Sequence, residues 1–288
     1  MKDLNYQLMK LCRENRDGSF STQATRKRIL DRIANQLHEL GYRRMQAKSL
    51  KPKHVAALVS LWKDQGMSVG TFKNRLSGLR WWARKVGKTD MIPKDNSAYD
   101  IGNRSQVAKE SKAQDLDENK LERISDPYVR LSLRLQAAFG LRREEAIKIS
   151  PNYAIKDDHI KLKSTWTKGG RARTVPISTG EQRQLLEEVR KLARGGALIP
   201  PMKDYEYQLH RYERQVRTAS IKNPHGLRHA YAQRRYEELT GWKASVAGGP
   251  ASKSLSSEQR ALDEGARETI AEELGHSREQ ISATYLGR

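Results

Sequence analysis

The sequence predicts a mainly α-helical protein with a small antiparallel β-sheet, built as an N-terminal helical bundle followed by an α+β domain. At 288 residues the chain is long enough for two cores, since one core usually serves about 100–200 residues. Apolar residues recur with helical spacing over most of the chain, and only short stretches of the second half alternate as strands do. A polar stretch that contains Pro93 and Gly102 interrupts this periodicity. We therefore expect domains at 1–87 and 114–288, joined by an interdomain linker at 88–113.

The N-terminal bundle is expected to contain three or four helices. Pro52 suits the first turn of a helix, and Gly41 and Gly66 suit helix ends, because glycine tolerates the left-handed conformation found there. Ser68 or Thr71 can cap the helix that follows, since either hydroxyl can accept a hydrogen bond from a free backbone amide. The apolar stripes that define these helices are Ile29, Ile33, Leu37 and Leu40, then Val55, Leu58, Val59 and Trp62, then Phe72, Leu76, Leu79, Ala83 and Val86.

In the second domain we expect helices with a few short strands between them. Leu116–Phe139 has helical periodicity, and a new helix is expected to begin near Arg142. The rest of the domain is again mostly helical, with a Gly-, Ser-, Ala- and Lys-rich interruption at Gly241–Gly265. The alternating residues that predict short strands lie around Ala154–Ile155, Ile160–Leu162 and Thr174–Ile177.

The balance of charge points to a polyanionic partner. The chain has 55 Lys and Arg against 34 Asp and Glu, a formal net charge of +21. This excess is spread through sequence with folded character, and nucleic acid is the leading candidate partner. Ribosomal, RNA-binding and membrane-surface proteins share such a composition, so charge alone identifies only a class of partner. Five basic residues lie on the polar face of the helix predicted over Phe72–Val86, where they are either DNA contacts or a solvated face: Lys73, Arg75, Arg80, Arg84 and Lys85.

The single cysteine, Cys12, excludes an internal disulfide and any zinc site with several cysteines, which is usual in a reducing compartment. We expect Cys12 to be a small core residue. Residues 1–13 carry charges among their apolar positions, so they form neither a signal peptide nor a membrane-spanning helix. These features predict a cytoplasmic, nucleoid-associated protein with no membrane partner.

Four short segments and one tyrosine carry residue types suited to phosphate chemistry. Gly140–Ala146 puts an arginine just after a glycine break, where it can project from a helix start. Thr167–Ile177 has the pattern of a β-hairpin with a glycine turn and a lysine near its tip. His225–His229 opens a helix with a histidine and an arginine three positions apart, so both lie on one face, and helix starts suit anions. Leu274–Arg278 ends a helix with a histidine, and Tyr285 follows nine positions after that histidine.

Taken one at a time, these residues have ordinary structural explanations. A surface arginine is common in a basic protein, and a Lys-Gly-Gly stretch is an ordinary polar turn. A histidine or arginine at a helix start can simply cap or solvate that end, and a tyrosine near a chain end usually packs into a core. Their order along the chain, and not any single residue, carries the functional prediction.

Together the segments resemble the tyrosine recombinase (phage integrase) family. The catalytic domain of that family carries an arginine, a hairpin lysine, His-x-x-Arg, a histidine or tryptophan, and a tyrosine in this order. The resemblance covers Gln114–Leu286, whereas the N-terminal bundle is similar to the family's helical core-binding domain in size, position and charge only. It implies a recombinase catalytic domain at 114–288 and a DNA-binding domain at 1–87.

Residue by residue, the resemblance implies an active site with a covalent nucleophile. Tyr285 would be the nucleophile, and Arg142 and Arg228 would bind the scissile phosphate. Lys168 would protonate the leaving 5′ oxygen. Arg143 replaces Arg142 if the register differs by one. Two histidines would hydrogen-bond the phosphate or manage the tyrosine proton, and one acidic residue would support the first arginine: His225, His276 and Glu145.

The physical chemistry supports such a site without the family name. Attack of an oxygen on a phosphodiester passes through a phosphorane-like state with additional negative charge, which two guanidinium groups can bind through paired hydrogen bonds. A tyrosine with a reference pKa of about 10 is mostly neutral at cellular pH, so a base or a strongly positive site must assist its attack. The sequence shows no acidic cluster suited to two magnesium ions and no Walker-type loop, so we expect neither a metal nor a nucleotide cofactor.

These expectations describe a site-specific DNA recombinase that cleaves and rejoins strands through a 3′-phosphotyrosine. It would act as a homo-tetramer on two DNA sites and serve the integration or excision of a mobile element. Two alternatives stay open. A type IB topoisomerase uses a similar constellation to relax DNA within one duplex, and a non-catalytic relative would bind DNA as a regulator. The complete set of catalytic residues argues against the second alternative.

The C-terminus departs from the family. A segment after the tyrosine commonly packs into a neighbouring subunit there, but only residues 286–288 follow Tyr285 in this chain. Three residues cannot form a docking helix, so either the chain is truncated or another element makes this contact. Gly241–Gly265 is the candidate element, with a tolerated surface loop as the alternative. We also expect no arm-binding domain, since there is no room for one before the bundle.

Overall fold

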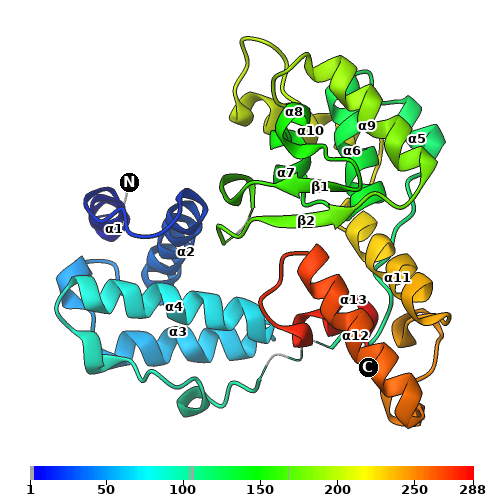
Figure 1. Cartoon of the computed structure of the whole chain (residues 1–288). Coiled ribbons are helices and arrows are strands. Elements are labelled where there is room, and N and C mark those ends of the chain that lie inside the picture. Colours follow the sequence, from blue (N-terminus) through cyan, green and yellow to red (C-terminus); the bar gives the residue numbers. More distant parts are fainter. Residues whose placement is uncertain (1–2, 104, 106, 168) are drawn as a thin grey trace. The chain divides into compact units, whose positions relative to one another are not determined.

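The computed structural model describes residues 3–103, 105, 107–167 and 169–288, so Lys168 lies outside the described residues. The chain divides into two compact units, Met1–Arg104 and Ser105–Arg288, each with its own buried core (Figure 1).

The division between the units lies inside the expected linker at 88–113, and both ends of that segment are packed. Ile92 is buried in the core of the first unit. The Ala108 N–H donates to the Ala283 carbonyl at 3.0 Å, and the N–H of residue 114 donates to the Gly226 carbonyl at 3.1 Å. The segment that begins at residue 105 is therefore fastened to the second unit by backbone hydrogen bonds.

The first unit is a helical bundle, as predicted. Most residues of the expected apolar stripes are buried in its core. The indole N–H of Trp62 donates to Gln36 at 2.9 Å and that of Trp82 donates to a backbone carbonyl at 2.9 Å, so both large side chains are buried with their polar groups satisfied. Ser68, and not Thr71, is the cap of α4. The elements of this unit are α1 (Asp3–Glu14), α2 (Phe20–Glu39), η1 (Ala47–Ser49), α3 (Pro52–Asp64), α4 (Val69–Lys85), η2 (Thr89–Met91) and η3 (Ser97–Tyr99).

The second unit is mostly helical, and its described part carries a two-stranded antiparallel sheet, which confirms the predicted fold class. In the sheet, Leu162 lies opposite Arg173 and His159 lies opposite Pro176. The elements up to the sheet are α5 (Glu118–Glu122), α6 (Pro127–Phe139), α7 (Arg143–Lys148), α8 (Pro151–Ala154), β1 (His159–Leu162), η4 (Ser164–Trp166) and β2 (Arg173–Pro176). The elements after the sheet are α9 (Gly180–Ala193), α10 (Tyr205–Thr218), α11 (Gly226–Thr240), η5 (Ser245–Ala247), η6 (Ser252–Ser254), α12 (Ser257–Glu273), η7 (Glu279–Ser282) and α13 (Ala283–Leu286).

Two predictions for the start of this unit are wrong, and a proline explains each. The single helix expected over Leu116–Phe139 is interrupted, because Pro127 begins α6 and Asp126 accepts the free amides of its first turn. The strand expected around Ala154–Ile155 is not formed, because Ala154 ends the single turn α8, which starts at Pro151. Only an isolated bridge links Ile155 to Ile160 of β1.

The predicted hairpin and the Gly/Ser-rich interruption also differ from expectation. Thr167–Ile177 is not a hairpin by itself, because it supplies β2 and part of the connection while the partner strand is His159–Leu162. The interruption at Gly241–Gly265 holds η5, η6 and the first turns of α12. That helix begins within it because the Ser256 hydroxyl accepts the Gln259 N–H.

The core of the second unit joins the elements that carry the predicted site. Its buried side chains come from α6, α11, α12 and α13 together with both strands, so segments far apart in the sequence share one core (Figure 1). None of the described helices is long and apolar enough to cross a membrane.

Candidate active site

The first part of the site is a helix end followed at once by a helix start. Gly140 ends α6 in the left-handed conformation (φ 59°), and a Cβ atom there would lie 2.5 Å from Cδ1 of Tyr231, so only glycine fits. Arg142 then precedes the first turn of α7, and the Glu145 carboxylate accepts its backbone N–H at 2.7 Å. This local sequence therefore places an arginine and a glutamate together on a fixed turn.

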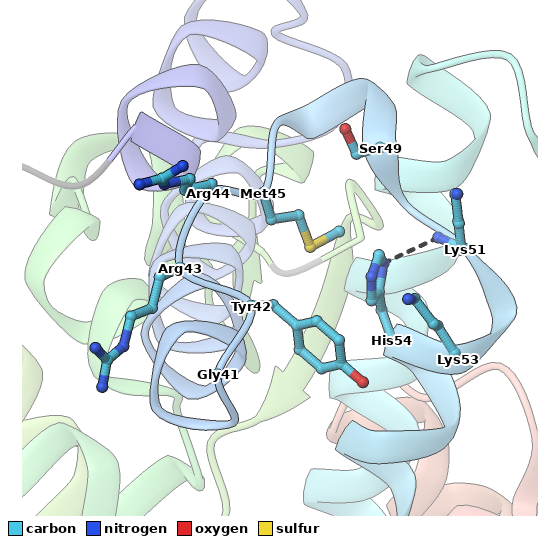
Figure 2. A pocket seen from close by; sticks show the side chains of 9 residues that line it. All are labelled: Gly41, Tyr42, Arg43, Arg44, Met45, Ser49, Lys51, Lys53 and His54. Carbon is cyan, nitrogen blue, oxygen red and sulfur yellow. Dashed lines mark hydrogen bonds between the residues drawn. The ribbon is translucent and has the colours of Figure 1, made fainter.

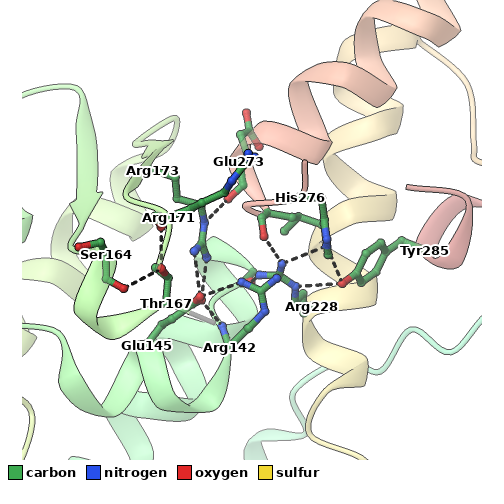
Figure 3. Close-up of polar contacts among 12 residues, drawn as sticks. Arg142, Glu145, Ser164, Thr167, Arg171, Arg173, Arg228, Glu273, His276 and Tyr285 are labelled. Atoms are coloured by element: carbon green, nitrogen blue, oxygen red, sulfur yellow. Dashed lines mark hydrogen bonds and ion pairs between the residues drawn. The ribbon is translucent and has the colours of Figure 1, made fainter. Parts of the chain in front are cut away.

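The Glu145 carboxylate is fully buried and accepts hydrogen bonds from two arginines (Figure 3). Besides the backbone amide, Arg142 donates Nη1 to Oε1 at 2.9 Å. Arg173 donates Nη1 to Oε1 at 2.8 Å and Nη2 to Oε2 at 2.6 Å. Burial alone would raise the pKa of Glu145, but the hydrogen bond and charge of Arg173, followed by the charges of Arg142 and Arg228, lower it to about 2. Glu145 is therefore an anion at neutral pH.

Arg228 lies in the first turn of α11 and is only 1% exposed. Its Nη1 donates to the Gly140 carbonyl at 2.5 Å, and its Nη2 donates to the Leu274 carbonyl. Its Nε donates to the hydroxyl of Tyr285 at 3.2 Å. Burial lowers the pKa of Arg228 to about 10, so the group remains a cation at neutral pH. Two backbone carbonyls thus fix a buried cation against the tyrosine.

The C-terminal end of α12 supplies carbonyl acceptors and a histidine. Gly275 adopts φ 66° directly after the helix, and two backbone hydrogen bonds around it close a Schellman motif. The last carbonyls of a helix have no partner inside the helix. Here the Glu273 carbonyl accepts Arg173 Nε at 2.7 Å, and the next carbonyl accepts Arg228 Nη2. The turn then directs His276 toward the guanidinium group of Arg228 (Figure 3).

Tyr285 lies in the short helix α13 and is 4% exposed. Its hydroxyl oxygen is 3.2 Å from Arg228 Nε and 3.2 Å from His276 Nε2. Its backbone carbonyl accepts Gln233 Nε2 at 3.0 Å, and its ring centroid lies 4.7 Å from that of His229. The phenol oxygen is therefore fixed between a cation and an imidazole.

Two imidazoles near the phenol are neutral at pH 7. Burial and then the charges of the neighbouring arginines lower the pKa of His276 to about 3. Burial and then the charge of His225 lower the pKa of His229 to about 4. The ring centroid of His225, at the start of α11, lies 5.5 Å from that of His229 and 6.5 Å from that of Tyr285. A neutral His276 can accept a proton at Nε2 when its own hydrogen is on Nδ1.

The structure places most of the predicted site residues close together. His225 lies beside them, and Lys168 is outside the described residues. Arg143, the alternative to Arg142, pairs on the exposed surface with Glu213 at 2.9 Å. Across the described ranges, no group of three or more His, Cys, Asp or Glu side chains is arranged to hold a metal ion. The predicted residues that meet are Arg142, Glu145, Arg228, His276 and Tyr285.

Arg173 belongs to the same site, although the pattern of its sequence segment points only to a lysine. It begins β2, where its side chain is buried like that of Val175, two positions later on the same face. A charged residue at an inward strand position signals a buried partner of opposite charge, and here that partner is Glu145. This alternation was the signal in the sequence that could have identified Arg173.

The basic residues predicted as DNA contacts on α4 are used mostly inside the first unit. Arg75 stacks on an indole ring, with 5.3 Å between Cζ and the ring centroid. Arg80 donates to a backbone carbonyl at 2.9 Å, and Lys85 lies 3.8 Å from an aspartate carboxylate. Lys73 and Arg84 make no comparable contact in the part of the chain that the structure describes. The α4 face is thus less available to a partner than its charge implies.

A second basic surface of the first unit is a pocket of about 490 Å³ at the turn between α2 and α3 (Figure 2). Arg43, Arg44, Lys51 and Lys53 line it, and none of its lining residues is acidic. The ion pairs described in this unit involve other lysines and arginines. His54 also lines the pocket, and its Nδ1 accepts the Lys51 N–H at 3.1 Å. Burial, then the charges of Lys53 and Lys51, lowers the pKa of His54. Because Nδ1 accepts the Lys51 N–H, the hydrogen of the neutral His54 ring lies on Nε2.

Two family models match the sequence. One, described as phage integrase, N-terminal, matches residues 1–92, and the other, described as integrase, matches residues 101–234. No curated protein sequence matches the chain significantly.

Solved structures share the fold over nearly the whole chain. XerH site-specific recombinase in a post-cleavage complex with palindromic difH substrate is 19% identical with a TM-score of 0.59, over 99% of this chain and 81% of that one. A lambda integrase dimer bound to a COC′ core site is 15% identical with a TM-score of 0.61, over 98% and 76%. The Tn1549 transposon integrase in complex with circular intermediate DNA is 16% identical with a TM-score of 0.54, over 100% and 96%. At these identities the likeness shows a common fold.

Proposed function

The chain belongs to the tyrosine recombinase (phage integrase) family, and we propose from this premise that it is a site-specific DNA recombinase that cleaves and rejoins strands through a 3′-phosphotyrosine on Tyr285. The observation that carries the proposal is the position of the Tyr285 hydroxyl, within hydrogen-bond distance of both Arg228 and His276. Arg142 and Glu145 lie next to this group (Figure 3).

Arg142 and Arg228 are proposed to bind the scissile phosphate. A guanidinium group has about five N–H donors. Arg142 uses one of them on Glu145 in the described structure, and Arg228 uses donors on Nε, Nη1 and Nη2, so N–H groups remain on both. Two fixed cations oppose the negative charge that grows on the phosphate during attack, and such preorganised donors favour the transition state.

In the proposed step the Tyr285 oxygen forms a bond to phosphorus while the bond from phosphorus to the 5′ oxygen breaks. The phenol proton passes to His276 Nε2, 3.2 Å away, and Arg228 Nε stabilises the charge that develops on the phenol oxygen. The leaving oxygen takes a proton from Lys168, a role that comes from the family resemblance. Because the phosphotyrosine retains the energy of the broken bond, attack by a free 5′ hydroxyl reverses the step without a nucleotide cofactor.

Double-stranded DNA is the proposed substrate, and a homo-tetramer on two DNA sites is the proposed active assembly. The net charge of +21 favours a polyanion. A lambda integrase tetramer bound to a Holliday junction shares the fold with a TM-score of 0.58 at 15% identity. The match to the integrase family model and the fold shared with a transposon integrase support a role in integrating or excising a mobile element.

The pocket between α2 and α3 is the proposed contact of the first unit with a DNA backbone phosphate. A phosphate would supply the negative charge that its four cations lack, and the neutral His54 would offer a further N–H. Lys53→Gln and Lys63→Gln form a matched pair in α3, because Lys53 lines the pocket whereas Lys63 pairs with Asp100 at 2.9 Å. Each phosphate contact contributes about −0.9 to the slope of log K against log salt, so only Lys53→Gln should make that slope shallower. Equal slopes for the two variants would remove the pocket from the interface.

A nicked suicide duplex from DNA that flanks the coding locus tests the whole proposal. Loss of the short cleaved strand traps the intermediate, so the wild-type protein should form a protein–DNA adduct that survives detergent. Two-site substrates then separate the alternatives, because a type IB topoisomerase relaxes plasmids without producing strand-exchange products. Absence of any adduct across the flanking sequences would refute cleavage and leave the non-catalytic DNA-binding regulator.

A further inference from the structure

The tightest ion pair near the phenol joins two residues that touch no reacting group in the proposed step. Arg173 and Glu145 form a two-pronged pair, with N···O distances of 2.8 and 2.6 Å, and their side chains are 5% and 0% exposed. Only arginine presents two parallel donors that match a carboxylate, so the geometry is specific for this residue type. The pair therefore fixes the orientation of the Glu145 carboxylate as well as neutralising its charge.

The pair limits how Glu145 can bind Arg142. Each carboxylate oxygen accepts one bond from each arginine: Oε1 binds Nη1 of both, and Oε2 binds Arg173 Nη2 and the Arg142 backbone N–H. A carboxylate has about four lone-pair sites, so these bonds occupy all of them. Arg142 can therefore give Glu145 only one guanidinium N–H. If Arg173 were absent, a buried anion would lose two donors, and the adjacent Arg142 guanidinium could turn to replace them.

The same side chain also contacts the end of α12. Arg173 Nε donates to the Glu273 carbonyl at 2.7 Å, and the neighbouring Leu274 carbonyl binds Arg228. A Cβ atom on Gly275 would lie 2.9 Å from Arg173 Cδ, so the glycine leaves the space that this side chain occupies. Arg173 of β2 thus links the turn that carries Arg142 to the end of α12, where the Leu274 carbonyl accepts a hydrogen bond from Arg228.

We infer that Arg173 is a positioning residue, which satisfies Glu145 so that most guanidinium N–H groups of Arg142 stay available to the scissile phosphate. This inference rests on the proposed strand cleavage. It assigns Arg173 no contact with DNA and no proton transfer.

The first test is Arg173→Met, which keeps the length of the side chain but removes its charge and donors. The measurements are the single-turnover rate of cleavage of the suicide duplex and the affinity for the same duplex. Cleavage should be about 10- to 100-fold slower, the scale of a misplaced reacting group, with little change in affinity. Arg134→Met is the control, because it removes another two-pronged pair, with Glu188 at 2.5 and 3.0 Å, away from the site. Its cleavage rate should match wild type.

The second test separates positioning from simple structural support. In the Arg173→Met background, Glu145→Gln replaces the anion that draws Arg142 away with a neutral amide, so the double variant should cleave faster than Arg173→Met. Loss of structural support alone predicts the opposite, because the second change removes further hydrogen bonds. Arg173→Lys keeps a cation but lacks the two-pronged geometry, so its cleavage rate should lie between those of wild type and Arg173→Met. If Arg173→Met does not fold, Arg173→Lys replaces it in both tests.

The outcomes distinguish this inference from the proposed function. A wild-type protein that forms no adduct refutes the proposed cleavage, and the role of Arg173 falls with it. A wild-type adduct together with unimpaired cleavage by Arg173→Met, or a double variant no faster than Arg173→Met, overturns the positioning role alone.

Discussion

Replacement of Tyr285 by phenylalanine removes one oxygen atom, and it should abolish the covalent adduct while the protein stays folded and binds DNA. The lost hydroxyl makes two hydrogen bonds of 3.2 Å, to Arg228 Nε and His276 Nε2, while the buried ring remains. One lost hydrogen bond costs about 0.5–1.5 kcal/mol, and a buried donor left without a partner costs about 1–3 kcal/mol. We therefore expect Tyr285→Phe to lower the free energy of unfolding by about 1–3 kcal/mol. For a unit of this size that corresponds to a melting temperature lower by about 2–12 °C.

The assay compares Tyr285→Phe with a matched tyrosine on the same suicide duplex. Tyr236 is buried in α11 of the same unit, and its hydroxyl donates to Asp263 at 2.5 Å. Tyr236→Phe should therefore lose a similar amount of stability and still form the adduct. Tyr231→Phe, which loses a hydrogen bond of 2.7 Å to Glu273, serves as a second control. An adduct that persists in Tyr285→Phe and disappears in either control would place the nucleophile in α11 and refute the proposed site.

Three further predictions concern the residues proposed to act on the phosphate and the dependence of folding stability on pH. Arg142→Ala and Arg228→Ala should each slow single-turnover cleavage by at least about a hundredfold, the scale of a lost transition-state donor, whereas Arg143→Ala should not; unchanged rates in the first two would exclude their role. Lys168→Ala should be rescued by a substrate with a 5′-bridging sulfur, which leaves without protonation, and equal defects on both substrates would make Lys168 a binding residue. Folding stability should fall as the pH drops from 7 toward 4, because the pKa values of folded His229 (about 4) and His276 (about 3) lie below the ordinary histidine value, so the unfolded chain binds protons first. Glu145, with a folded pKa of about 2, adds to this loss once the pH falls below its ordinary value. In urea titrations, His229→Gln should reduce the loss of unfolding free energy between pH 7 and 5 by about 1–2 kcal/mol. If the unfolding free energy of the variant depends on pH as that of wild type does, His229 is not a source of the loss.

Local patterns in the sequence determined the helical class, most helix positions and the turns that carry the site. The helix end at Gly140 depends on a backbone conformation that only nearby residues decide, so the glycine predicted it. The helix end predicted over Leu274–Arg278 has the same local cause, because Gly275 also has a positive φ. The two wrong predictions at Pro127 and Pro151 also had local causes, because proline at a first helical turn starts a new helix there. The order of the arginine, histidine and tyrosine segments likewise needed no structure.

Only the tertiary structure decided which of these side chains meet. Tyr285 reaches Arg228 because α11, α12 and α13 pack into one core, and no local periodicity encodes that packing. The part played by Arg173 depends on strand register, which turns its side chain inward, and on the end of α12, which brings a free carbonyl to it. The basic residues of α4 also depend on tertiary contacts. The sequence shows their charge, but the indole ring, the carbonyl and the carboxylate that bind them come from other segments of the chain. Charge and helical spacing depend on residues that are neighbours along the chain. The hydrogen-bond partner of a buried group depends instead on which distant segments pack together and exclude water from the group.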